Sequence, residues 1–136
     1  MTNIEKVDNF LTEAKIFYIV TVDNNKPKAR PISFKLLQDD KIWFGVGTFK
    51  DVYKQLQTNP NIEIIAMANN KWLRYDGKVH FVNDEQLENK CLDILGPIGK
   101  MYKDNNYHMG MFYIENAHVE IKSVIKTLEE FDLWLL

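Results

Sequence analysis

The sequence predicts a mainly β fold with helices (α+β), in which six antiparallel strands form a small closed or nearly closed barrel with peripheral helices. β-Branched and aromatic runs recur along the chain, separated by turn clusters such as Asp23–Pro27 and Asn69–Asn70. Two helices are inserted between successive hairpins, and closing the sheet on itself removes its exposed edges. No repeat, linker or low-complexity run divides the chain, so residues 1–136 are expected to form a single domain.

The composition narrows the class of protein. The chain has 136 residues, of which 46% are hydrophobic and 26% charged, the profile of one globular domain. Its 17 basic and 19 acidic residues argue against a nucleic-acid binder, and one cysteine excludes a disulfide framework. Because no apolar run resembles a signal peptide or a membrane span, we expect a soluble, cytoplasmic protein without membrane contact.

The elements of the first half follow from hydrophobic periodicity. Ile4, Val7 and Leu11 recur at helical spacing, which predicts a helix over 3–14. An antiparallel meander with short connections is expected next. Its strands cover residues 16–22, 28–37 and 41–46.

The second half begins with a short helix over 50–57, which Asn59-Pro60 stops. Strands are expected over 61–68 and 71–82, with a bulge or tight bend at Asp76-Gly77. The remaining expected elements are a helix over 83–95 capped by Asn83, one more helical turn over 98–102, a strand over 111–122 and a terminal helix over 123–131. The apolar end of the chain, residues 131–136, is expected to dock on the body or on a second subunit.

The segment Gly45-Val46-Gly47-Thr48-Phe49-Lys50 is the first candidate for chemistry. Free N–H groups at the start of a helix bind anions, and glycines let a phosphate approach the backbone. Thr48 can donate a hydrogen bond and Lys50 adds positive charge. The spacing matches neither a Walker loop nor a dinucleotide fingerprint, and a plain strand-to-helix turn with Thr48 as N-cap is the alternative.

Two arginines are the other candidates, and they are the only arginines in the chain. Arg30 stands in the second strand before Pro31, which belongs at an edge or a distorted position, and a guanidinium can clamp a phosphate. Arg30 and Lys50 could converge on one anion; an ordinary surface arginine is the alternative. Trp72 and Arg74 share a face of the fifth strand and suit a flat aromatic ligand, or simply a packed tryptophan.

Other reactive residue types show no functional pattern. His80, His108 and His118 lack metal-ligand spacing, so no metal site is expected. Cys91 shares an apolar helix face with Leu87 and is expected to be a buried, inert thiol. No serine stands in a nucleophile elbow, and no catalytic residue can be named.

Several segments together resemble the pyridoxamine 5′-phosphate oxidase-related, FMN-binding split-barrel proteins. They are Phe17–Val22, Lys26-Pro27-x-x-Arg30-Pro31, Ile42–Gly45, Thr48–Leu56 with Asn59-Pro60, Trp72-x-Arg74-x-x-Gly77-Lys78 and Met109-x-Met111-Phe112-Tyr113. The resemblance covers residues 4–121. It implies a six-stranded split barrel and a homodimer with FMN at the subunit interface.

The resemblance also implies a set of cofactor-binding residues. Arg30, Thr48 and Lys50 match the phosphate-binding positions. The segments Pro31-Ile32-Ser33 and Val46-Gly47 would run beside the isoalloxazine ring, and Gln55 matches a polar position near the cofactor. Trp72, Arg74 and residues near Phe112 would come from the partner subunit.

The function implied is that of an FMN-dependent oxidoreductase, with electrons passing from NAD(P)H through FMN to a small-molecule acceptor. Three alternatives stay open at this point. One is a non-enzymatic flavin-binding module. Another is a haem-binding split-barrel protein, for which one of the three histidines would be the axial ligand. The third is a structural barrel dimer without a ligand.

Overall fold

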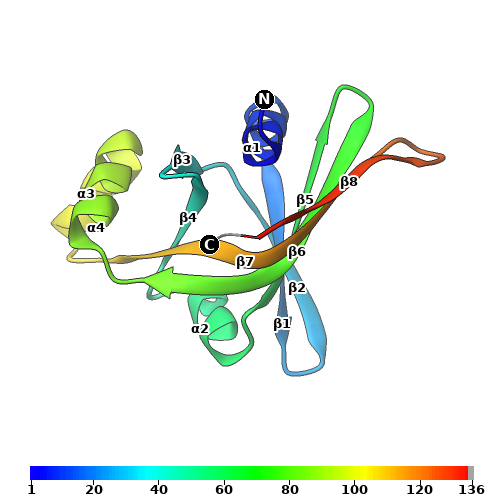
Figure 1. Cartoon of the computed structure of the whole chain (residues 1–136). Coiled ribbons are helices and arrows are strands. Elements are labelled where there is room, and N and C mark those ends of the chain that lie inside the picture. Colours follow the sequence, from blue (N-terminus) through cyan, green and yellow to red (C-terminus); the bar gives the residue numbers. More distant parts are fainter. Residues whose placement is uncertain (135–136) are drawn as a thin grey trace.

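The structure, a computed structural model, describes residues 1–134 and shows eight strands and four helices (Figure 1). In chain order they are α1 (Asn3–Ala14), β1 (Phe17–Asp23), β2 (Lys26–Ile32), β3 (Leu36–Gln38), β4 (Lys41–Gly47), α2 (Asp51–Thr58), β5 (Asn61–Ala68), β6 (Lys71–Val82), α3 (Glu85–Ile94), α4 (Pro97–Asp104), β7 (Met109–Lys122) and β8 (Thr127–Leu133). The predicted mainly β class, with peripheral helices, is confirmed. None of the described helices is long and apolar enough to cross a membrane.

All strand pairs are antiparallel, and the order across the sheet is β2-β1-β5-β6-β7-β4-β3, with β8 also paired to β7. The two edge strands, β2 and β3, follow one another in the chain. Only residues 33–35 lie between them, and the four steps from Ile32 to Leu36 span at most about 14 Å. The sheet therefore curls until its edges approach, and it remains split between β2 and β3.

The strand count differs from the prediction for two local reasons. The expected strand over 28–37 is two strands, because the chain leaves β1 after Ile32 and pairs with β4 from Leu36 onward. The expected terminal helix over 123–131 is wrong. Residues Thr127–Leu133 form β8, which pairs with the end of β7 from Ala117 to Lys122.

The helical insert between β6 and β7 is also more regular than expected. The N-cap of α3 is Asp84, whose carboxylate accepts a hydrogen bond of 3.1 Å from the Leu87 N–H, so the expected cap at Asn83 is wrong by one residue. The single expected turn over 98–102 extends into α4, which starts with Pro97 after a positive φ at Gly96.

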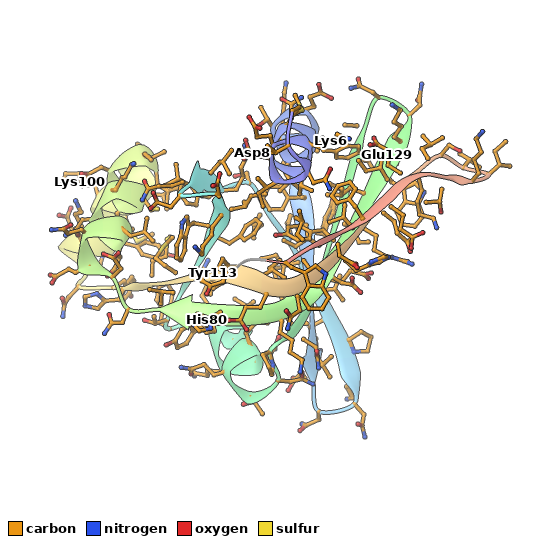
Figure 2. All side chains as sticks on the ribbon, in the orientation of Figure 1. Lys6, Asp8, His80, Lys100, Tyr113 and Glu129 are labelled. Carbon is orange, nitrogen blue, oxygen red and sulfur yellow. The ribbon has the colours of Figure 1, made fainter. Side chains whose placement is uncertain are left out.

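The main core fills the barrel, and α1 and α2 pack against it at opposite ends of the barrel (Figure 1). A second, smaller core lies under α3 and α4 and includes Trp43, Cys91 and Met111. Lys6 of α1 also reaches Glu129 of β8, at an Nζ–Oε1 distance of 3.0 Å (Figure 2). Near the C-terminus Leu133 is buried and Trp134 exposed, while Leu135 and Leu136 lie outside the described residues.

The predicted irregularity in β6 is confirmed. Asp76 lies opposite His118 and Lys78 opposite Glu115, so Gly77 faces a bulge whose extra residue belongs to β7. A Cβ atom at Gly77 would stand 2.5 Å from the Glu115 carbonyl oxygen and 3.1 Å from the Ala117 Cα. Glycine is required here because β7 crosses directly over the position.

Candidate functional site

The side chain of Arg30 points into the barrel and joins a buried polar network. Its Nη1 donates to the Thr21 hydroxyl at 2.8 Å, and its Nη2 donates to the Gln55 Oε1 at 2.8 Å. The Thr21 hydroxyl in turn donates to the same Gln55 oxygen at 2.6 Å. β1, β2 and α2 thus each contribute one residue to this network.

The pairing of β1 with β2 explains why Arg30 faces inward. Arg30 lies opposite Ile19, whose side chain is fully buried, and its Nη1 is 3.4 Å from the Ile19 carbonyl oxygen. Burial lowers the pKa of the Arg30 guanidinium, and the nearby Asp51 carboxylate opposes that shift. Arg30 stays charged at every relevant pH, so the network holds a permanent, half-buried positive charge.

Thr48 and Lys50 lie at the entry to α2 but are not part of this network. The Thr48 N–H and hydroxyl both donate to the His108 carbonyl oxygen, at 2.9 and 3.3 Å. The N-cap of α2 is Lys50, not Thr48, and no side chain caps the helix. The ammonium group of Lys50 is exposed and lies 5.9 Å from the centre of the Phe49 ring.

Two separate hollows flank α2. Gln55, Asp51 and Lys54 line a polar groove of about 580 Å³ next to the β1–β2 turn. Thr48 lines another hollow of about 370 Å³ together with Tyr53 and residues of β6, α3 and β7. The predicted phosphate ligands therefore surround the first two turns of α2, but this structure does not bring Thr48 and Gln55 into one hollow.

The donor set around α2 fits a phosphate. Arg30 uses Nη1 and Nη2 within the network, while its Nε–H and the Gln55 amide nitrogen make no hydrogen bond within the described chain. Lys50 and the uncapped N-terminus of α2 add positive potential. Asp51 is the one acidic side chain in the first turn of the helix.

The segments predicted to flank the ring border the split in the barrel. Pro31 and Ile32 end β2, which is an edge strand as its proline implied, and Ser33 begins the link to β3. β3 pairs only with Lys41–Trp43, so within the described chain no strand covers that side of residues 44–47, which include Val46 and Gly47. A Cβ at Gly47 would lie 2.8 Å from both Phe49 and the Tyr102 hydroxyl, so aromatic side chains already fill that face of the glycine.

Trp72 and Arg74 lie on the outer face of the sheet, away from Arg30. The Arg74 guanidinium lies 5.2 Å from the centre of the Trp72 ring, and its Nε is 2.8 Å from the Glu63 Oε1. That contact lacks hydrogen-bond geometry, which leaves the buried Arg74 Nε–H without a partner among the described residues. Within one chain these residues and Arg30 do not share a site.

Phe112 is completely buried in the barrel core, with its ring 5.6 Å from that of Phe44 and stacked on it. Its side chain is thus a packing residue in this chain. Thr21 is the one residue of the polar network that the sequence analysis missed. The available signal was its position: it alternates with Phe17 and Ile19 and so carries a hydroxyl on the buried face.

Burial raises the pKa of the Cys91 thiol to about 11, which agrees with the inert thiol predicted from its apolar surroundings. Each of the three histidines lies beside a carboxylate: His80 beside Glu115, His108 beside Glu88, and His118 beside Asp132 and Glu130.

Comparison of the sequence with models of known protein families gives one match. The sequence model of the family described as pyridoxamine 5′-phosphate oxidase matches residues 4–121. No curated protein sequence matches the chain.

Similar solved structures share the fold. A NimC/NimA family protein from Clostridium acetobutylicum is 24% identical, with a TM-score of 0.86, and the match covers 98% of this chain and 95% of that one. An FAD-binding protein from Mesorhizobium loti is 12% identical (TM-score 0.62; 90% and 96% covered). HutZ, the haem storage protein from Vibrio cholerae, is 16% identical (TM-score 0.59; 84% and 89% covered).

Proposed function

The chain belongs to the pyridoxamine 5′-phosphate oxidase family, and from that premise we propose that it is an FMN-binding oxidoreductase that passes electrons from NAD(P)H to a small acceptor. The proposal includes a homodimer, because the residues assigned to the cofactor lie on two faces of one chain. Arg30 is inside the barrel, whereas Trp72 and Arg74 are on its outer face.

The observation that carries the proposal is the half-buried Arg30 guanidinium, held by Thr21 and Gln55 beside the N-terminus of α2. A half-buried guanidinium whose Nε–H is unused can donate a charge-assisted hydrogen bond to an anion. A phosphate is the anion that suits a planar guanidinium, a helix N-terminus and a nearby lysine together.

The roles of the chain's residues follow from their positions. Arg30 and Lys50 would hold the phosphate, and Thr48 would join them once its hydroxyl turns away from the His108 carbonyl oxygen. Gln55 fixes the direction of the Arg30 fork. Residues 31–33 and 46–47 would border the ring at the split, with Trp72 and Arg74 of a second copy on its other side. FMN, when bound, supplies the hydride chemistry at its N5 atom.

Haem is the alternative ligand, and it would need one of the three histidines as its axial ligand. An axial ligand needs a free imidazole nitrogen facing an apolar pocket. In the described chain each histidine stands near the surface, and none of the three lines the groove beside Gln55. Flavin therefore suits the site better than haem does.

The test is the absorption spectrum of the purified protein, followed by titration with FMN. We expect a flavin spectrum, or uptake of one FMN per chain, and bleaching by NADPH or NADH without oxygen. A Soret band would overturn the proposal in favour of haem, and a protein that takes up neither group would overturn it outright. Bound FMN that no nicotinamide reduces would indicate a flavin-binding module instead of an oxidoreductase.

The substitution Arg30→Met tests whether the Arg30 guanidinium binds the phosphate of FMN. Losing a charged hydrogen bond of about 1.5–3 kcal/mol raises the FMN dissociation constant by roughly 10- to 150-fold. Lys26→Met, on the same strand but in the exposed β1–β2 turn, is the matched control and should change the constant less than about twofold. Equal effects of the two substitutions would contradict the role of Arg30, provided that circular dichroism shows both variants folded.

A further inference from the structure

A second cluster of polar side chains lies on the β7–β8 hairpin, on the outer face of the sheet. The strand register places His118 opposite Asp132 and Glu120 opposite Glu130. Because residues two apart on a strand share a face, all four side chains project from the same side of the hairpin. The backbone pairing thus holds the cluster on two rigid strands.

The ring of His118 is fixed between carboxylates. Its Nδ1 lies 2.7 Å from the Asp132 Oδ1, and its Nε2 lies 2.8 Å from the Glu130 Oε2 and 3.6 Å from the Glu120 Oε1. An ionised carboxylate only accepts hydrogen bonds. With the Nδ1 proton committed to Asp132, Nε2 faces two further acceptors, so either a second ring proton or a cation has to stand between Nε2 and those carboxylates.

We propose that His118, Glu120 and Glu130 form a binding site for one divalent transition-metal ion of the Zn²⁺ class. One nitrogen and two carboxylate oxygens already lie within 4.8 Å of one another, close enough to share one ion. Imidazole and carboxylate are ligands that Zn²⁺ accepts. An imidazole ligand also selects against Mg²⁺ and Ca²⁺, which prefer oxygen.

The neighbours of the three ligands support this assignment. In metal sites the ligating histidine usually donates its other N–H to a carboxylate, and Asp132 is that partner here. Lys122 Nζ donates to the Glu120 Oε2 at 3.1 Å and to the Thr127 hydroxyl at 3.1 Å. This leaves the Glu120 Oε1 turned toward His118 and free to coordinate.

The surroundings leave space for a fourth ligand. His118 lines a groove of about 500 Å³ that also includes Glu63, Asp76, Asn116 and Lys78. Its two carboxylates outnumber its one lysine, which favours a cation, and the open groove lets water reach the ion. The sequence analysis expected no metal site because the ligands come from two strands, and no spacing within one segment shows them.

The same geometry has a competing explanation, in which the His118 imidazole is doubly protonated. It would hold His118 between Asp132 and Glu130 with no metal at all. The two explanations predict different results when Zn²⁺ is added to the metal-free protein: only the metal site binds the ion. The test therefore does not depend on flavin binding or on any activity.

Titration of the metal-free protein with Zn²⁺, by calorimetry, should give one ion per chain. Asp132→Asn removes only the orienting carboxylate and should weaken Zn²⁺ binding by about 10- to 100-fold. His118→Gln and Glu130→Gln remove ligands and should weaken it at least as much. His80→Gln is the matched control, because His80 pairs with one carboxylate, Glu115, on the same sheet, and it should leave the affinity unchanged within about twofold.

A readout on the unmodified protein keeps the test valid if a variant fails to fold. In a protein labelled with ¹⁵N-histidine, Zn²⁺ should shift the Nε2 resonance of one histidine and leave the other two in place. Zn²⁺ binding that His118→Gln does not weaken, shifts spread over all three histidines, or no binding at all would each overturn the proposal in favour of the protonated imidazole.

Discussion

The two faces of β6 and β7 are built from alternate residues of the same strands, yet they differ in almost every respect. Leu73, Tyr75 and Val119 point inward and are buried, with fractional exposures no greater than 1%. Trp72, Arg74 and Glu120 point outward and are half-buried among charges. The inward-facing side chains share only their burial in the apolar core. The outward-facing side chains instead form specific charged and aromatic pairs.

The outer face also carries apolar side chains that a solvated surface does not need. Met67 is 74% exposed and Tyr18 is 48% exposed. His80 stacks on Tyr113, with ring centres 5.0 Å apart (Figure 2). Residues of this kind typically serve contacts with a ligand or another chain. The comparison teaches that the inner face of β6 and β7 serves packing, while their outer face leaves side chains available for contacts.

The largest effect is expected from truncation on the inner face. Phe112→Ala removes a fully buried ring that stacks on Phe44, and it should lower the free energy of unfolding by about 3–5 kcal/mol. His80→Ala, on the outer face of the neighbouring strand, should change it by less than about 1 kcal/mol. Urea unfolding measures both variants, and similar losses would remove the distinction between the faces.

An intermediate effect is expected where the inner face cannot hold a side chain. Gly77→Ala places a methyl group against the backbone of Glu115 and Ala117, which should lower the free energy of unfolding by about 1–3 kcal/mol. Lys78→Ala, the next residue and outward-facing, is the control and should have little effect. A neutral Gly77→Ala in the same urea measurement would mean that the bulge adapts easily.

The smallest effect is expected from a charge on the outer face. Burial raises the pKa of Glu63, although Arg74 opposes that shift. A raised pKa means that the fold favours the protonated carboxyl, so Glu63 weakens the fold as the pH rises through that pKa. Glu63→Gln, which resembles the neutral form, should therefore match or exceed the stability of the unmodified protein at pH 7, by up to about 0.5 kcal/mol.

That difference should close as the pH falls below the ordinary glutamate value of about 4.3. Urea midpoints at neutral and acidic pH measure it. If Glu63→Gln is instead less stable at neutral pH, the ion pair with Arg74 outweighs the desolvation of the carboxylate, and the outer face contributes to stability as the inner face does.

Most of the fold follows from the sequence because inner-face alternation is a local pattern. The helix over residues 3–14 and the strand over 61–68 were predicted with the observed bounds. Thr127–Leu133 could not be assigned in this way. Leu128 and Phe131 stand at helical spacing, and only pairing with β7 makes the segment a strand. Long-range pairing overrides local spacing there.

The candidate site was predictable only in part. Arg30 and Gln55 were both named, and the structure joins them. Thr21, which links them, reads in the sequence as one more β-forming residue of the first strand. Thr48 was expected beside the phosphate, but its hydroxyl donates to the His108 carbonyl oxygen, a partner that no spacing in the sequence could indicate.

The position of β7 in the chain has a consequence for biosynthesis. β4 pairs on one side with β3, but its other partner is β7, with Phe44 opposite Phe112. A ribosome adds roughly 5–20 residues per second, so β4 waits several seconds with that edge bare. Nascent chains stalled before Met109 should thus be open to proteases and chaperones, and the barrel becomes protected only when residues 109–122 have left the exit tunnel.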